Sequence, residues 1–355
     1  MKKILFIGMH RLNRSPSQRY RFEQYLDVLV EKGFKYDISP LISANDDQFL
    51  YAQKKIFRKL FILFKSIIVR LRDLLKASQY DYIFIQREAF LTGSSFFERQ
   101  FSKSRAKVVY DFDDAIWLTD FNQANRKLQW LKNPKKIKRI IECSNLIVAG
   151  NEYLAAYARR YNDKVVVLPT TIDTDLYRPV QQPIRTTVCI GWTGSFSTIK
   201  HFELALPVLQ KLKNEFKGNL IFKVIGDENY SYPPLQLHGV KWDPDREVDE
   251  LSDIDIGIMP LPDNPWTRGK CGFKALQYMG MGIPAVTSPV GVNNEIIRDG
   301  VNGFLAADED QWFEKLRMLV KSSDLRKQIG MAGRSTVEAR YSKKAYTTAF
   351  LKLFS

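Results

Sequence analysis

Short apolar runs alternate with stretches of helical periodicity along the first half of the chain. Apolar runs of strand length, bounded by polar residues, are typical of buried strands, whereas apolar residues three and four positions apart are typical of helices. The predicted strands are Lys3–Gly8, Tyr82–Gln86, Val108–Asp111, Leu146–Ala149 and Val165–Leu168. The predicted helices are Arg19–Lys32, Gln53–Ala77, Pro134–Cys143 and Glu152–Tyr161. Strands that alternate with helices predict a parallel sheet with right-handed crossovers.

The same alternation begins again in the second half of the chain. The predicted strands there are Val188–Trp192, Leu220–Ile225, His238–Val240, Ile254–Met259, Ala285–Thr287 and Phe304–Leu305. The predicted helices are His201–Phe216, Glu247–Leu251, Gly272–Met281, Glu295–Arg298, Glu309–Ser322, Ser323–Arg340 and Lys343–Leu353. We therefore expect two open α/β domains in tandem, with a ligand cleft between them at the carboxyl ends of their strands.

A proline-containing segment separates the two patterns. Pro179 and Pro183 lie within it, and prolines remove backbone donors and restrict their neighbours. We predict a linker at residues 171–185, between an amino-terminal domain at 1–170 and a carboxyl-terminal domain at 186–340. Residues 341–355 are expected to form a helix that packs back on the first domain.

The positive charge of the chain is concentrated in its first half. The 355 residues have a formal net charge of +15. Residues 1–170 contain 31 lysines and arginines against 17 acidic residues, whereas residues 171–355 contain 23 against 22. This asymmetry indicates two domains with different partners, one of them anionic. Three widely spaced cysteines favour a reducing cytoplasm, and we expect neither a signal peptide nor a transmembrane helix.

Three cations gather at one predicted helix start in the second half. Arg268, Lys270 and Lys274 follow a buried strand and a loop rich in proline and glycine. Free N–H groups at the amino end of a helix attract anions and disfavour cations. The cations therefore indicate a phosphate site. The alternative is a strand–helix unit with solvated lysines at the start of its helix.

Residues 269–286, which begin Gly-Lys-Cys-Gly-Phe-Lys, and residues 291–303 resemble the carboxyl-terminal signature of glycosyltransferase family 4. Residues 191–195 and 167–173 match further pieces, and the resemblance covers nearly the whole chain in element order. It implies the GT-B fold, in which two Rossmann-like, doubly wound parallel sheets face a central cleft. It also implies a nucleotide-diphosphate sugar as donor, retention of the anomeric configuration, and no cofactor or metal.

The sequence departs from this family at two positions. Most members have two glutamates on the loop and helix start, one for the donor sugar and one for the ribose, and this chain has Gly269 and Gln277 there. Glutamine still hydrogen-bonds a ribose, but glycine has no side chain with which to contact the sugar. Asp263 and Glu295 are the alternative sugar contacts. The departure leaves the identity of the donor open, and with it the possibility of an inactive relative.

The resemblance implies that cations stabilise the leaving diphosphate, which itself helps to deprotonate the acceptor. Arg268 and Lys274 are therefore candidate catalytic residues. The full set of candidate diphosphate ligands is Arg19, Arg21, Gly194, Ser195, Lys200, Arg268, Lys270, Lys274 and Gln277. The alternative for the two amino-terminal arginines is a solvated helix start. Val240 and Trp242 are candidates for contacting the nucleotide base, and the alternative for the tryptophan is a half-buried packing role.

Three carboxylates close one strand of the first half, namely Asp111, Asp113 and Asp114. Such a cluster first suggests Mg²⁺, which takes one or two carboxylates plus substrate phosphates. The resemblance instead places Asp113 and Asp114 near the acceptor, where they orient a hydroxyl or accept its proton. We expect no metal site, and the three histidines show no ligand spacing with one another.

Residues 53–76 carry eight lysines and arginines against a single aspartate. Apolar residues recur there at helical spacing, and an apolar face with a cationic rim is typical of a helix that lies on an anionic membrane. The candidate membrane contacts are Lys54, Lys55, Arg58, Phe61, Phe64 and Lys65. The alternative is a domain helix packed on the sheet with a solvated basic face. Nucleic acid would also attract the charge, but the chain shows no nucleic-acid motif.

Together these features predict a retaining glycosyltransferase on the cytoplasmic face of the cell membrane. It would transfer a sugar to a saccharide or lipid-linked saccharide in polysaccharide or lipopolysaccharide synthesis. Two alternatives stay open: a GT-B nucleotide-sugar epimerase, which would act without an acceptor, and a non-catalytic scaffold that kept the fold.

Overall fold

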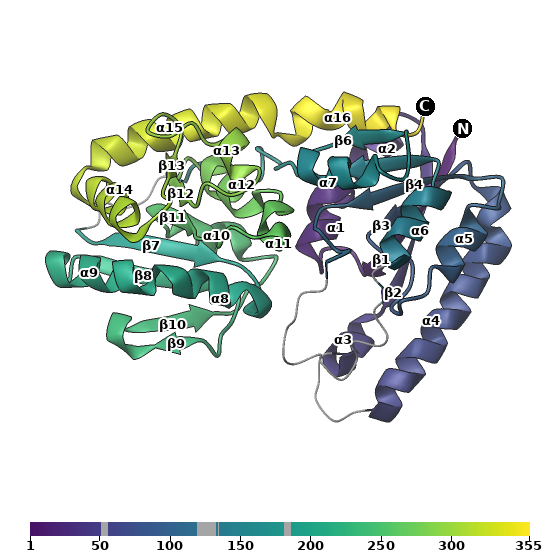
Figure 1. Cartoon of the computed structure of the whole chain (residues 1–355), viewed down its shortest axis with the longest axis horizontal. Helices are drawn as coiled ribbons and strands as arrows, with labels where there is room; N and C mark the ends of the chain where they lie inside the picture. The colour runs from purple at the N-terminus through teal and green to yellow at the C-terminus, as the bar shows by residue number, and fades with distance from the viewer. Residues whose placement is uncertain (51–55, 119–132, 134, 181–185) are drawn as a thin grey trace. The chain divides into compact units, whose positions relative to one another are not determined.

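The computed structural model describes residues 1–50, 56–118, 133, 135–180 and 186–355. It consists of two compact units (Figure 1). The first unit contains residues 1–169 and 347–355, and the second contains residues 170–346. Lys54 and Lys55 lie outside the described residues, as does the end of the predicted linker at 181–185.

A parallel sheet forms the centre of the first unit, in the order β2-β1-β3-β4-β5-β6. Its strands are β1 (Lys3–His10), β2 (Lys35–Ile42), β3 (Tyr82–Gln86), β4 (Lys107–Phe112), β5 (Leu146–Ala149) and β6 (Val165–Val167). The chain winds outward from β1 in both directions, so the sheet is doubly wound, as the resemblance implied. All side chains of β3 are buried, which explains why its bounds were predictable from an apolar run alone.

The helices of this unit cover the sheet and differ from the prediction at the amino end. They are α1 (Pro16–Arg21), α2 (Leu26–Glu31), α3 (Ala44–Leu50), α4 (Ile56–Lys76), α5 (Phe96–Phe101), α6 (Lys135–Cys143) and α7 (Glu152–Ala158), with 3-10 turns at Glu23–Tyr25 and Ala77–Gln79. The single helix predicted for residues 19–32 is wrong. Phe22 has a φ of −143°, outside the helical range, and it divides the segment.

Strand β2 was missing from the prediction. Its residues alternate in burial instead of forming a continuous apolar run, and it contains Pro40. Proline is tolerated in edge strands, and β2 is at the edge of the sheet.

The last nine residues of the chain belong to the first unit. They include most of α16 (Lys343–Lys352), and Phe350 stacks on Tyr25 with ring centroids 4.3 Å apart. Phe354 packs against Phe6 and Tyr82. The carboxyl end therefore completes the aromatic core of the first unit.

The second unit has a seven-stranded sheet in the order β13-β12-β11-β7-β8-β10-β9. Its strands are β7 (Val188–Thr193), β8 (Leu220–Ile225), β9 (Ser231–Tyr232), β10 (Leu237–Val240), β11 (Ile256–Met259), β12 (Ala285–Thr287) and β13 (Phe304–Leu305). All pairs are parallel except β9 with β10. The order again winds outward in both directions, here from β7, and the unit has its own apolar core.

Helices of the second unit follow most of its strands. They are α8 (Ile199–Phe202), α9 (Leu206–Phe216), α10 (Glu247–Ser252), α11 (Pro265–Arg268), α12 (Phe273–Gly280), α13 (Asn293–Ile296), α14 (Glu309–Lys321) and α15 (Ser323–Arg340), with 3-10 turns at Phe196–Thr198, Glu203–Ala205 and Pro233–Leu235. Within the segment predicted as a linker, Thr171, Ile172 and Tyr177 are fully buried. This part is packed into the second unit.

Candidate active site

The carboxyl ends of β7 and β11 lie side by side in the centre of the second sheet, where the strand order reverses. Ligands of open α/β sheets bind at such a reversal. Gly194 and Ser195 directly follow β7, and Lys200 lies in the short helix α8 after them. The loop after β11 leads to Arg268, Lys270 and Lys274. The fold therefore brings the two groups of predicted phosphate ligands to one edge of the sheet.

Helix α12 is fixed directly over the end of β7. The backbone N–H of Thr193 donates a hydrogen bond of 2.9 Å to the hydroxyl of Tyr278. One turn earlier in the helix, the ammonium of Lys274 lies 5.3 Å from the ring centroid of the buried Trp192. A cation over an indole face is attracted by the ring quadrupole. Lys274 is half-buried, so its charge is held beside the turn that follows β7.

Glycine is required where the ends of β7 and β8 approach each other. A Cβ at Gly194 would lie 2.4 Å from the Trp192 ring, and one at Gly226 would lie 1.6 Å from the carbonyl oxygen of Gly194. Gly226 also has a φ of +140°. After this contact Ser195 caps the Phe196–Thr198 turn through a capping box with Thr198. The side chains of Ser195 and Lys200 are exposed.

Arg268 and Asp263 form an exposed ion pair on the loop after β11. The Nε of Arg268 is 2.6 Å from one carboxylate oxygen of Asp263, and a terminal nitrogen is 2.9 Å from the other. This guanidinium lowers the pKa of Asp263. The predicted sugar contact and the predicted phosphate contact thus pair with each other. Lys270 is half-buried, with its ammonium 5.3 Å from the ring centroid of Trp266.

The turn that precedes Glu295 is packed against the same loop. A Cβ at Gly291, which has a φ of +55°, would lie 2.7 Å from the carbonyl oxygen of Arg268. A Cβ at Gly272, the residue before α12, would lie 2.3 Å from Ile296. These close approaches fix α13 against the start of α12, and Glu295 is exposed on α13.

The structure corrects the predicted placement of Gln277. Its side chain is buried, and its amide nitrogen donates a hydrogen bond of 3.0 Å to Glu247, so that nitrogen does not face a ligand. The same oxygen of Glu247 accepts a hydrogen bond of 3.0 Å from the indole of Trp242, and the other accepts one of 2.6 Å from the hydroxyl of Tyr177. Trp242, which was predicted to contact the base, thus has its indole nitrogen in this cluster. Val240 ends β10, and its carbonyl accepts a hydrogen bond from Gly226.

Sequence reasoning did not find Glu247. It is the first residue of α10, where an acidic residue is ordinary, and two of the three partners named above, Gln277 and Tyr177, are 30 and 70 positions away in the chain. No local signal distinguishes it from a solvated carboxylate at a helix start.

Asp113 and Asp114 lie just after β4 in the first unit, where Arg87 pairs with both carboxylates. Ser17 donates a hydrogen bond of 2.6 Å to Asp113. Burial opposes the charged form of Asp113, but Arg87, Arg21 and Ser17 favour it, and its pKa is lowered. Arg87 was missed, although a cation directly after the predicted strand 82–86 was a usable signal. It has a φ of +61°.

The prediction that Arg21 faces a ligand cleft is wrong. Its side chain and that of Asp111 are both fully buried, and their closest nitrogen and oxygen are 2.5 Å apart. Arg21 also donates to the carbonyl of Leu168. The residue is therefore part of the internal structure of the first unit. Arg19 is half-buried, with its guanidinium 5.1 Å from the ring centroid of Tyr20.

The predicted membrane segment presents its apolar residues to the surface. Phe57, Phe61 and Phe64 of α4 are 84%, 65% and 62% exposed. Arg58 is exposed, with its guanidinium 4.1 Å from the ring centroid of Phe49. Lys65 pairs with Asp46 at 2.6 Å. Another face of α4 is buried, through Ile62, Ser66 and Arg70, and the helix contacts β2. The alternative of a packed domain helix therefore holds for that face but does not account for the exposed phenylalanines.

The described residues contain neither a candidate metal site nor a candidate membrane-spanning helix. No cluster of three or more histidine, cysteine, aspartate or glutamate side chains there is arranged to hold a metal ion. No helix there is both long and apolar enough to cross a membrane.

Comparisons with known proteins agree with this architecture. Residues 187–322 match the family described as Glycosyl transferases group 1. Glucosyltransferase 3 of Streptococcus parasanguinis is 23% identical over 224 residues, which are 59% of this chain and 68% of the relative. Sucrose-phosphate synthase of Thermosynechococcus elongatus superposes with a TM-score of 0.75 at 15% identity, covering 100% of this chain and 98% of that one. TarM of S. aureus superposes with a TM-score of 0.69 at 12% identity, covering 100% of both chains.

The two parallel-sheet units and these matches define a protein with the GT-B fold. The resemblance to glycosyltransferase family 4 is confirmed, and the chain is a glycosyltransferase, an enzyme that transfers a glycosyl group.

Proposed function

We propose that this enzyme transfers a sugar, with retention of configuration, from a nucleotide-diphosphate donor bound at the strand ends of the second unit. The observation that carries the proposal is the position of Lys274 beside the end of β7, with Lys270 and Arg268 on the segment that leads to its helix. Positive charge and backbone N–H groups at one edge of a parallel sheet suit a diphosphate. HepE of Anabaena, a structural neighbour, has been solved with UDP-glucose, and TarM with UDP.

In the proposed reaction the protein supplies charge stabilisation and position. As the bond between the sugar and the diphosphate breaks, negative charge grows on the leaving oxygens, and Lys274 and Lys270 stabilise it. When the donor binds, Arg268 leaves its ion pair with Asp263 and contacts the phosphates. The carboxylate of Asp263 can then accept hydrogen bonds from the sugar hydroxyls. This exchange gives the loop a carboxylate in place of the one missing at Gly269. Retention follows if the acceptor attacks from the face that the diphosphate leaves.

Asp113 and Asp114 are proposed to orient the acceptor hydroxyl. Their pairing with Arg87 lowers the pKa of Asp113, and a carboxylate with a low pKa is a weak proton acceptor. The leaving diphosphate is then the base that takes the acceptor proton. We propose that neither a metal nor another cofactor takes part.

The transfer is tested by incubating the protein with a panel of UDP-, ADP-, GDP- and dTDP-sugars and membrane-extracted acceptors. We expect release of one nucleoside diphosphate and a labelled product that depends on the extract. Release of an isomerised nucleotide sugar without an acceptor would support an epimerase instead. No turnover across the whole panel would support a non-catalytic scaffold.

For the acceptor side we propose a peripheral position on the cytoplasmic face of the membrane, with a saccharide or lipid-linked saccharide as substrate in cell-surface polysaccharide synthesis. The exposed apolar face of α4 supports this proposal. Six large apolar side chains of α4 are exposed, namely Phe57, Leu60, Phe61, Phe64, Leu71 and Leu75. Arg58 and Arg72 are exposed on the same helix. Apolar residues with adjacent cations suit the surface of an anionic bilayer.

The double substitution of Phe61 and Phe64 by serine is expected to reduce binding to vesicles that contain phosphatidylglycerol by tenfold or more. Burying one phenylalanine in an apolar phase contributes roughly 1.5–3 kcal/mol, and the variant loses two. Co-sedimentation with vesicles measures the effect. The matched control is Leu204→Ser, which removes an exposed apolar side chain from the second unit. Undiminished binding of the double variant would contradict the role of α4.

A further inference from the structure

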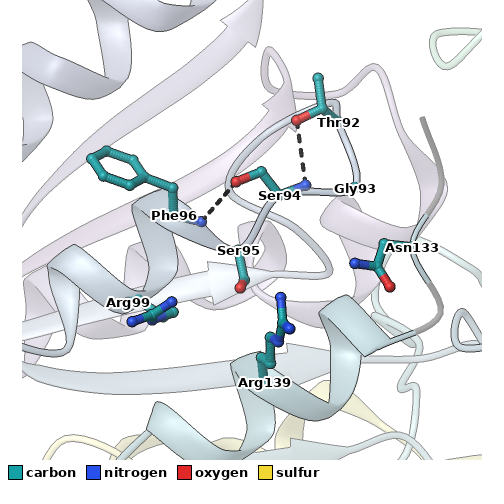
Figure 2. Close-up of a pocket in the computed structure, with 8 residues that line it drawn as sticks. All are labelled: Thr92, Gly93, Ser94, Ser95, Phe96, Arg99, Asn133 and Arg139. Carbon is teal, nitrogen blue, oxygen red and sulfur yellow. Dashed lines mark hydrogen bonds between the residues drawn. The ribbon is translucent and has the colours of Figure 1, made fainter. Parts of the chain in front are cut away.

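A pocket of about 480 Å³ lies in the first unit, and its lining does not include the carboxylates that follow β4 (Figure 2). The loop before α5 forms one wall through Thr92, Ser94 and Ser95. Arg99 of α5 and Arg139 of α6 line it from the two helices. None of these residues has a role in the proposed transfer, so the pocket requires its own explanation.

The loop wall is held in place from behind by Lys136. This side chain is only 2% exposed, and its ammonium donates hydrogen bonds of 2.7 Å to the carbonyl of Phe90 and 2.8 Å to that of Thr92. It also pairs with Glu88 at 2.9 Å. The internal charge is therefore neutralised by a carboxylate and fixes the backbone around the pocket.

The loop also supports itself. The backbone N–H of Ser94 donates a hydrogen bond of 3.4 Å to the hydroxyl of Thr92, and the N–H of Phe96 donates one of 3.2 Å to the hydroxyl of Ser94 (Figure 2). Lys136 adds two further hydrogen bonds to the backbone of this segment. The pocket is thus preformed, which lowers the entropic cost of binding a ligand.

The groups that face the pocket favour an anion. Neither Arg99 nor Arg139 forms an ion pair with a carboxylate in the described ranges. Ser95 is only 4% exposed and lines the pocket, yet its hydroxyl has no hydrogen-bond partner among the residues that the structure describes. Two guanidinium groups and a buried hydroxyl present hydrogen-bond donors. Planar guanidinium forks match the paired oxygens of phosphate.

We propose that this pocket binds the phosphate or diphosphate group of a phosphorylated acceptor. The ligand's role as an acceptor rests on the proposed function, whereas the phosphate site rests on the pocket alone. Helix α5 packs against both α6, which carries Arg139, and the amphipathic α4 (Figure 1). A lipid-linked diphosphate, whose lipid would lie in the membrane proposed to contact α4, is one source of such a group. A soluble sugar phosphate has the same charged chemistry.

The test measures inorganic pyrophosphate binding by isothermal titration in a Lys274→Ala background, which weakens the donor site. Adding Arg99→Gln and Arg139→Gln is expected to reduce the remaining affinity by roughly tenfold or more, because two charged hydrogen-bond donors are lost. The control variant carries Lys103→Gln and Arg105→Gln, which remove the same charge from exposed positions of the same unit. It is expected to bind like its parent.

Equal pyrophosphate affinity in the pocket variant and the control would overturn the proposal, as would no binding in the parent. The single variant Arg139→Gln repeats the comparison if the double variant unfolds. UDP and ADP binding to the unmodified chain, measured alongside, reports on the donor site separately, so its failure leaves the pocket comparison intact.

Farnesyl diphosphate distinguishes the two sources of the phosphate. Tighter binding than inorganic pyrophosphate, lost on substituting Phe61 and Phe64 by serine, identifies a lipid-linked acceptor. Equal affinity for the two probes, still dependent on Arg99 and Arg139, identifies a soluble phosphorylated acceptor. Either result supports the phosphate site.

Discussion

Replacing Arg21 by methionine is expected to lower the free energy of unfolding by about 3–5 kcal/mol, the usual cost of removing one partner of a buried ion pair. Asp111 has no exposed surface, and Arg21 is the cation that contacts it through two nitrogens. Methionine fills much of the volume but leaves the carboxylate buried without that cation. Urea unfolding of both proteins measures the difference.

The loss is expected to depend on pH. Burial raises the pKa of Asp111, and Arg21 opposes that rise. Without Arg21 the folded variant therefore has a still higher pKa at this carboxyl, so its stability falls as the pH rises through that value and recovers in acid.

Two further variants distinguish the effect of losing the ion pair from nonspecific destabilisation of the fold. Combining Arg21→Met with Asp111→Leu is expected to restore most of the stability, because the second change removes the unpaired charge. Arg19→Met, on the same helix but half-buried, is expected to cost less than about 1 kcal/mol. If Arg21→Met also costs less than about 1 kcal/mol, the ion pair between Arg21 and Asp111 does not stabilise the first unit.

Replacing Lys274 by alanine is expected to weaken nucleoside-diphosphate binding by about 10- to 100-fold, since a hydrogen bond to a charged group contributes about 1.5–3 kcal/mol. Lys274 is half-buried beside the turn after β7, so solvent screens its charge less than it screens an exposed lysine. Isothermal titration with UDP, ADP and GDP measures the effect.

The matched control for this experiment is Lys327→Ala, an exposed lysine on α15 of the same unit. It is expected to leave nucleotide affinity unchanged. Arg268→Ala is expected to weaken binding less than Lys274→Ala, because Arg268 must first leave Asp263. Unchanged affinity in both site variants would contradict the assignment of this edge of the sheet to the diphosphate.

Buried apolar runs made most of the fold predictable from sequence. The predicted bounds of β3, β5, β8 and β12 agree with the structure. A central strand of a parallel sheet is buried on both faces, so its apolar run coincides with the strand. Strand β2 is an edge strand with a proline, and this signal does not apply to it.

The candidate site was predictable in position but not in its pairings. Spacing indicates which residues follow the end of a strand, and in this way it placed Gly194, Ser195 and Lys274 at one edge. It carries no information on which side chains pair across long separations. Gln277 and Arg21 were therefore assigned to ligands, whereas the structure pairs Gln277 with Glu247 and Arg21 with Asp111.

Retaining transfer from a nucleotide-diphosphate sugar is tested by proton NMR of the sugar product, which reports the configuration at the anomeric carbon. With an α-linked donor and a membrane-extracted acceptor, the first product is predicted to have the α configuration. The Lys274→Ala variant is expected to form this product at a greatly reduced rate. A β product would contradict retention, and no sugar released from any donor in the panel would contradict the proposed transfer.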